Sequence, residues 1–328
     1  MLSLVVCHIS PINLLSSWWD GLSSQFTLAF QMGLMVVVCA TCARSPQVSK
    51  LLDGLAGLVH TRVAALILLM AFGYVSSMLN WAFCTIVTPI LAMQLAKRVK
   101  GLHFPMMVAG GYCCMILGQC LGPSATLYSN LATEGSNYAE IVGKTMTVAE
   151  TCYNPVNVVL WVILAVCFIV LVLFTQPGDD ELVELRNIAT QADVAPKDYQ
   201  SREKATTPAE KMNTCKPIMW IVGAAIFIYI IYSIATKGFF ATLNMNMVIF
   251  MFVGINCFLF PQPHSWMEAH TDSMHLATDV ILQFPFYGAI MGMMYVEGGL
   301  GSVIVNAIVS VATAQTNASI LIPVSSSC

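Results

Sequence analysis

Uncharged apolar stretches long enough to cross a lipid bilayer recur along this chain. A membrane-spanning helix needs about 20 apolar residues. Stretches of this kind lie at residues 26–43, 104–121, 156–174, 217–235, 239–260 and 280–296. Charged residues make up only 9% of the 328 residues, whereas an ordinary soluble domain carries roughly 25%. The sequence therefore predicts an all-α, polytopic integral membrane protein whose solvent is the lipid bilayer. With 14 Lys and Arg against 17 Asp and Glu, it has no basic field for nucleic acid.

One uncharged stretch, residues 63–96, is too long for a single helix and too short for two full crossings. As a helix it would extend roughly 51 Å, against a hydrocarbon core about 30 Å thick. Arg62 precedes it and Lys97 follows it, which places both ends on the same side of the membrane. These features predict a re-entrant helical hairpin with its tip at Asn80-Trp81. Two short helices that each cross the membrane would also return the chain to the same side, so this alternative remains possible from the sequence.

The distribution of Lys and Arg predicts the orientation. If the span at residues 26–43 ends inside, 12 of the 14 basic residues lie inside, as the positive-inside rule requires. Residues 179–216 hold 14 of the 31 charges, so we expect a largely disordered cytoplasmic linker. The predicted organisation in the inner membrane is a first membrane half at residues 1–178, this linker, and a second membrane half at residues 217–328.

Polar side chains in hydrocarbon are expensive and are therefore candidate binding residues. Asn80 and Trp81 at the predicted hairpin tip are the strongest candidates. Where a helix breaks within the membrane, free N–H groups and the helix dipole can stabilise a carboxylate, and free carbonyls can hold a cation. The alternative for Asn80 is a capping residue in an ordinary loop.

Two further breaks are predicted from proline and glycine. The first lies at residues 118–126, where Ser124 and Thr126 would face the same cavity as the hairpin tip if the break lies beside it. A helix C-cap at the membrane surface is the alternative. The second break is at Pro285, two positions after Gln283. This glutamine binds substrate or bonds a neighbouring helix.

Several other motifs do not indicate catalytic, metal or cofactor sites. The CxxC pair Cys39 and Cys42 has no second pair or histidine at metal spacing, which favours buried thiols. Three histidines fall within residues 261–279: His264, His270 and His275. Their spacing matches no usual metal pattern, and we expect a solvated loop, with a proton sensor as the alternative. The spans contain no cluster of acid, base and nucleophile, so the sequence predicts no enzyme.

Four short motifs resemble those of the bacterial short-chain fatty acid (acetoacetate/butyrate-type) transporters, a family within the ion transporter superfamily. Asn80-Trp81-Ala82-Phe83 is similar to the hairpin tip of that family. Leu282–Tyr287, read QFPFY after its leucine, and the glycine-rich step at residues 298–301 are similar to a second block. The remaining matches are an early block, WWDGL at residues 18–22 with AFQM at residues 29–32, and a looser one, LNMN at residues 243–246.

The resemblance implies a secondary carrier of butyrate- or acetoacetate-like carboxylates, built from two inverted repeats that each contain a re-entrant hairpin. Asn80 and Trp81 match the first hairpin tip, which in this family helps to bind substrate and coupling ion. Residues 63–96 contain no Asp or Glu, so a coupling proton would need Asp279, Glu297 or the substrate as its carrier. The oxygen-rich breaks slightly favour sodium. The sequence leaves open whether the protein is a homodimer.

The C-terminal end departs from the family pattern. Members continue into a second hairpin with an asparagine and a glycine-rich tip, and residues 317–324 are similar only to the start of that segment. The expectation is therefore an incomplete inverted repeat and a C-terminally truncated carrier. The alternative is a truncated membrane remnant that does not transport.

Overall fold

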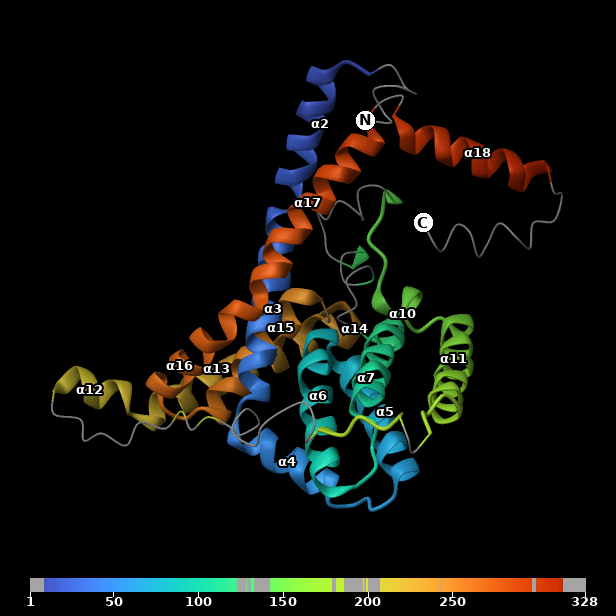
Figure 1. Ribbon diagram of the computed structural model, residues 1–328. Helices are drawn as coiled ribbons and strands as arrows, with labels where there is room; N and C mark the ends of the chain where they lie inside the picture. Colours follow the sequence, from blue (N-terminus) through green and yellow to red (C-terminus); the bar gives the residue numbers. More distant parts are fainter. Residues whose placement is uncertain are drawn as a thin grey trace. The chain divides into compact units, whose positions relative to one another are not determined.

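The computed structural model describes residues 9–122, 128, 131–132, 142–178, 181–185, 197, 199, 207–242, 244–296 and 299–314. All regular structure in these residues is helical (Figure 1). Six segments are long and apolar enough to cross a membrane: Pro11–Ala43, Arg62–Leu79, Phe104–Leu121, Pro155–Phe174, Lys216–Lys237 and Pro263–Tyr295. The predicted all-α, polytopic membrane protein is thereby confirmed. The division into two membrane halves stays a prediction.

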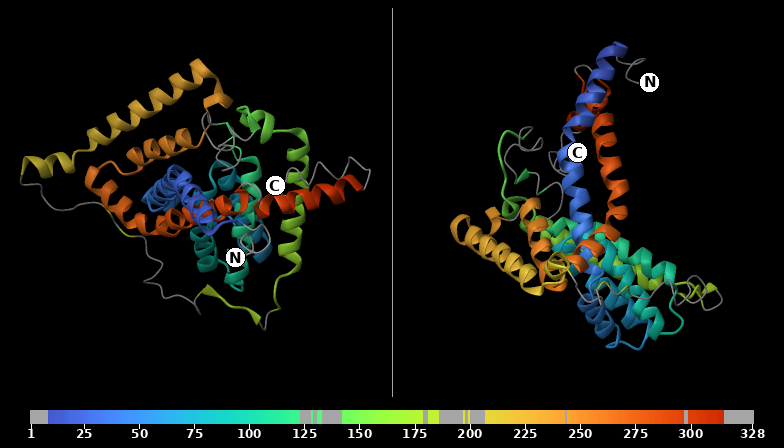
Figure 2. Two further views of the ribbon diagram at one scale, coloured as in Figure 1. Left: turned by 90° about the horizontal axis from the view of Figure 1, so that it is seen from above. Right: turned by 90° about the vertical axis from the view of Figure 1, so that its left-hand side faces the viewer.

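The chain forms two compact units, residues 1–33 with 277–328 and residues 34–276. In the first unit, α2 (Pro11–Ser24) and the start of α3 (Phe26–Ala43) form one nearly continuous rod, which lies beside α17 (Thr278–Tyr295) (Figures 1 and 2). The unit ends with α18 (Leu300–Ala314). The predicted break at Pro285 is wrong, because α17 runs through this proline without interruption. A proline removes one helical hydrogen bond, and membrane helices tolerate that loss where local adjustments satisfy the freed carbonyl.

Glycines allow α2 and α17 to approach closely. Gly288 and Gly292 form a GxxxG spacing on α17, and Gly288 lies against Gly21 of α2. A Cβ atom added at Gly292 would overlap the backbone oxygen of Ser17. Small residues at such a spacing let two helix backbones pack directly against each other.

We expect Gly292→Ala to destabilise the protein by about 1–3 kcal/mol, because its methyl group forces α2 and α17 apart. Gly54→Ala is the matched control: Gly54 has nothing within 4 Å of an added Cβ atom, and alanine favours the helix by up to about 1 kcal/mol. Thermal unfolding of the purified variants in detergent measures both effects. An unchanged melting temperature for Gly292→Ala would contradict the close packing.

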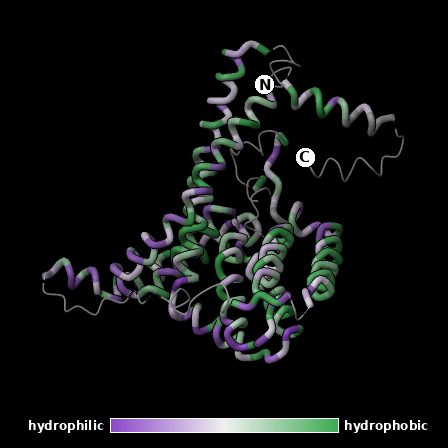
Figure 3. Tube along the Cα trace, in the orientation of Figure 1, coloured by the Kyte–Doolittle hydropathy of each residue, from purple (hydrophilic) through white to green (hydrophobic). Residues whose placement is uncertain are grey.

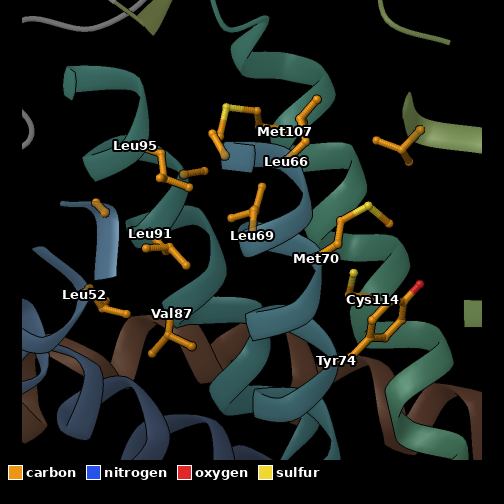
Figure 4. Close-up of a cluster of buried hydrophobic side chains, with 14 of the residues drawn as sticks. Leu52, Leu66, Leu69, Met70, Tyr74, Val87, Leu91, Leu95, Met107 and Cys114 are labelled. Atoms are coloured by element: carbon orange, nitrogen blue, oxygen red, sulfur yellow. The ribbon is translucent and has the colours of Figure 1, made fainter. Parts of the chain in front are cut away.

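The second unit contains the predicted hairpin. Its arms are α5 (Arg62–Leu79) and α6 (Trp81–Arg98), and they pack with α4 (Pro46–Ala56), α7 (Phe104–Gly118) and α11 (Pro155–Phe174). A cluster of buried hydrophobic side chains lies between the two arms and α7 (Figure 4). Its fully buried side chains include Leu52, Leu69, Met70, Leu91, Leu95 and Met107. A hydropathy-coloured trace shows α11 as an almost continuously hydrophobic helix (Figure 3).

A further helical pair in this unit consists of α13 (Lys216–Lys237) and α15 (Met245–Leu259), connected through the short α14 (Phe239–Thr242). The single span predicted at residues 239–260 is therefore wrong. Asn244 starts a new helix because its side-chain oxygen accepts a hydrogen bond from the backbone N–H of Met247 at 3.0 Å. Such N-capping competes successfully with continuation of a helix.

The solvated loop predicted at residues 261–279 is also wrong. Pro263–Met274 forms the helix α16, followed by the 3₁₀ turn His275–Ala277, and Pro263 occupies the first turn, where proline is well tolerated. Within the helix, His270 stacks on Trp266 with ring centroids 5.0 Å apart. The described residues contain no cluster of three or more potential metal ligands.

Two described residues of the charged segment 179–216 contact the helical region around α15 and α16. Tyr199 is buried and packs against Phe260. The ammonium group of Lys197 lies 2.7 Å from a carboxylate oxygen of Asp272 and 3.1 Å from one of Glu268, and these two acids raise the pKa of Lys197. The short helix α12 (Pro208–Asn213) precedes α13. Lys197 and Tyr199 thus contact α16 and the end of α15, and the role of the segment as a cytoplasmic linker stays a prediction.

Short connecting elements complete the described structure. These are the 3₁₀ turn η1 (Gln119–Leu121) after α7 and the four-residue helix α10 (Val148–Thr151) before α11.

Candidate functional site

The hairpin arms α5 and α6 are joined by a single residue, Asn80. Its backbone is extended (φ −163°, ψ 132°), which breaks the helix without a loop. Its side-chain oxygen accepts hydrogen bonds from the backbone N–H groups of Ala82 at 2.8 Å and Phe83 at 3.1 Å. Asn80 is completely buried. It is therefore an N-cap, as one of the two interpretations of the sequence proposed, but the cap lies inside the protein rather than in a surface loop.

Two sulfur atoms of α3 contact the side-chain amide of Asn80. The Cys39 thiol donates to Asn80 Oδ1 at 3.4 Å, and Asn80 Nδ2 lies 2.9 Å from Met35 Sδ. A thioether is a weak hydrogen-bond acceptor. The amide N–H groups of Asn80 thus have a soft partner that a carboxylate oxygen could replace.

The next residue, Trp81, has an unsatisfied donor. Its indole Nε1 is buried and has no hydrogen-bond partner among the residues that the structure describes. Leaving such a donor unpaired typically costs about 1–3 kcal/mol, and buried unpaired groups at native sites call for a specific explanation. The tip therefore has donors on two consecutive residues: the Asn80 amide, whose partner is a weak acceptor, and the Trp81 indole, which has no described partner.

The break predicted at residues 118–126 lies beside the hairpin tip, as far as the described residues reach. The helix α7 ends at Gly118, and η1 then leads to Gly122. An added Cβ atom at Gly118 would overlap the side chain of Ser77, and one at Gly122 would lie 3.1 Å from the carbonyl oxygen of Met78. The chain at this break thus runs directly against the last turn of α5. Ser124 and Thr126 lie outside the described residues.

Side chains of α11 stabilise this irregular end of α7. The Trp161 indole donates to the carbonyl of Leu117 at 2.7 Å, and the Asn157 amide donates to that of Cys120 at 2.8 Å. Free carbonyls at a helix end must find donors when no water is present. Backbone carbonyls left free at this helix end therefore have specific hydrogen-bond donors from α11.

The other predicted binding residue, Gln283, belongs to the first compact unit. It is exposed on α17, and its side-chain oxygen lies 3.4 Å from the hydroxyl group of Tyr287 one turn away. Its substrate-binding role stays a prediction.

Comparison with known proteins decides the family. The family described as "Short chain fatty acid transporter" matches residues 1–327. This chain belongs to the short-chain fatty acid transporter family. It is 28% identical over 309 residues to the "Putative short-chain fatty acid transporter" of Escherichia coli K12, which covers 94% of this chain and 68% of the relative. A protein of the same name from Haemophilus influenzae is 26% identical over 312 residues, with 92% of this chain and 68% of the relative covered. No solved structure matches the chain.

This transporter has polar groups near the tip that the sequence did not single out. Asn256 of α15 is fully buried; its amide nitrogen donates to the carbonyl of Val38 at 2.8 Å, while its side-chain oxygen has no partner among the described residues. An asparagine in the apolar second half of α15 was the available signal for it. For Cys39 there was none, because a thiol in an apolar helix usually behaves as a small hydrophobe.

Proposed function

We propose that this protein is a secondary carrier of butyrate- or acetoacetate-like carboxylates in the inner membrane, coupled to sodium. The hairpin α5–α6 is re-entrant, and residues 179–216 lie on the cytoplasmic side. Membership of the short-chain fatty acid transporter family supports the substrate class, and the concentration of basic residues on one side supports the orientation.

The observation that carries the proposal is the unpaired indole N–H of Trp81 beside the buried Asn80. A carboxylate is an acceptor-only group, so it can satisfy the Trp81 donor and replace Met35 as the partner of the Asn80 amide. Hydrogen bonds to a charged group are stronger than those between neutral groups, at about 1.5–3 kcal/mol each. Ser124, Thr126 and Gln283 are proposed as additional substrate-binding residues.

Two observations favour sodium over protons as the coupling ion. Residues 63–96 contain no carboxyl group that could carry a proton. The Asn256 side-chain oxygen is a buried acceptor without a donor, and amide and carbonyl oxygens are ligands of hard cations. The Asn256 side chain reaches from α15 to the turn of α3 that also contacts Asn80. Its amide nitrogen donates to the carbonyl of Val38, and the thiol of the next residue, Cys39, donates to Asn80 Oδ1.

An inward sodium gradient is expected to drive butyrate accumulation in proteoliposomes, because oxygen ligands and no carboxyl group are available at the hairpin. The measurement is uptake of radiolabelled butyrate under an imposed sodium gradient, compared with an imposed pH gradient at equal potassium on both sides. Accumulation driven by the pH gradient alone would reject sodium coupling. No accumulation under either gradient would reject the carrier itself.

A further inference from the structure

A second cavity, distinct from the hairpin tip, lies between α13, α14 and α15. Its volume is about 400 Å³, which falls within the range of small-molecule sites. Its apolar lining includes Met247 and Phe250, and Phe250 lies edge-to-face against Tyr229 with ring centroids 5.9 Å apart. Its polar lining includes Ser233 and Lys237.

The lysine on this cavity is unusual in its surroundings. Lys237 is the last Lys or Arg of the chain and the only one after Lys216. It ends α13, and Gly238 follows with φ +88°, a conformation that favours glycine and turns the chain at once. Lys237 is exposed and forms no ion pair or hydrogen bond with any described residue. A cation at a helix C-terminus stabilises the helix modestly, but that role does not require a cavity.

A second polar group on the cavity is also unpaired. Ser233 is 4% exposed, and its hydroxyl has no hydrogen bond with any described residue. The neighbouring Thr242 is already satisfied, because its hydroxyl donates to the backbone oxygens of Gly238 at 2.8 Å and Ser233 at 3.1 Å. The Ser233 hydroxyl lines the cavity and is therefore a donor available to a ligand bound there.

The geometry points to this cavity as a second binding site for a short-chain monocarboxylate. Lys237 and Ser233 hold the carboxylate, and Met247 and Phe250 cover the alkyl chain. A small anion with an apolar tail matches a lining that contains both a cationic group and an aromatic ring. The inference rests on the proposed function, because it assigns this site to the capture of the same substrate before it reaches the hairpin tip. The rival ligand for a lysine near the end of a membrane helix is an anionic lipid headgroup.

The test measures butyrate uptake by proteoliposomes of phosphatidylcholine alone. Lys237→Gln is expected to raise KM about five- to tenfold, since a cationic cavity concentrates anions by at least that order, with the maximal rate unchanged. Lys237→Arg keeps KM near the wild-type value. Lys144→Gln is the matched control, because Lys144 is the other basic residue placed on the same side by the charge distribution, and it does not line the cavity. An unchanged KM for Lys237→Gln overturns the inference. So does an effect that occurs only when phosphatidylglycerol is added, which would assign the lysine to lipid.

A binding measurement separates this inference from the proposed function. Purified Asn80→Ala protein, which is expected to have strongly reduced transport, should still bind radiolabelled butyrate at one site. The double variant Asn80→Ala/Lys237→Gln should lose at least tenfold in affinity at that site. Equal binding by the two variants overturns the cavity site whether or not the wild type transports. A wild-type protein that binds through Lys237 but never transports butyrate rejects the carrier function and leaves the cavity site supported.

Discussion

Asn80→Ala is expected to reduce butyrate uptake about 10- to 100-fold while the protein still inserts into the membrane. The substitution removes the amide donor to the carboxylate, which contributes about 1.5–3 kcal/mol and therefore corresponds to about one to two orders of magnitude in rate or affinity. It also removes the N-cap of α6, which contributes about 1 kcal/mol to the stability of the folded protein. The measurement is initial uptake in vesicles, normalised to the amount of protein in the membrane.

A matched control separates the cap from the binding role. Asn154 caps α11 in the same way, accepting a hydrogen bond from the backbone N–H of Val156 at 3.1 Å. Asn154→Ala should therefore lower the melting temperature by a similar amount and leave uptake nearly unchanged. If both variants lose uptake equally, Asn80 acts only through helix stability. Wild-type uptake kinetics in Asn80→Ala would reject the hairpin tip as the site.

Trp81→Phe is expected to raise KM for butyrate about tenfold without destabilising the empty protein. Phenylalanine keeps an aromatic ring at this position but removes the indole N–H, which is buried and unpaired in the described structure. Deleting an unpaired buried donor is neutral or stabilising in the empty state. When substrate is bound, the same deletion removes a hydrogen bond to a charged group, which corresponds to about a tenfold loss in affinity. Uptake kinetics and thermal unfolding with and without butyrate measure the two effects.

Trp266 provides the control for Trp81. Its indole nitrogen is likewise buried and without a partner among the described residues, but it lies on α16 in a cluster with Tyr199 and Phe260. Trp266→Phe should leave KM unchanged. A rise in KM in both variants would indicate a general effect on packing, and a lowered melting temperature for unliganded Trp81→Phe would show that its indole is paired in the empty protein.

The hairpin could be predicted from the sequence because its determinants are local. The absence of charge over residues 63–96, the basic residues at both ends and a single central asparagine fix two arms and a tip at Asn80. The break after Gly118 is similarly local, since a glycine followed by a proline, as at residues 122–123, favours the end of a helix. Its position beside the tip entered the prediction only as a condition, and the sequence did not decide between that position and a C-cap at the membrane surface.

Other features depend on packing that one sequence does not reveal. Pro285 carries a strong local signal for a break, yet α17 continues through it while packing along α2. Asn244 carries a weak signal within an apolar stretch, yet it starts a helix. The unpaired state of the Trp81 indole could not be predicted at all, because it depends on which side chains fail to reach it.

The single-residue connection at Asn80 also restricts how this protein can vary. Each residue added to an α-helix turns it by about 100°, so one inserted residue at the tip would rotate α6 and turn its buried residues Ala82, Val87 and Leu91 away from the core. A longer turn at this position would change the packing of α6. Insertions and deletions in functional relatives should therefore avoid the hairpin.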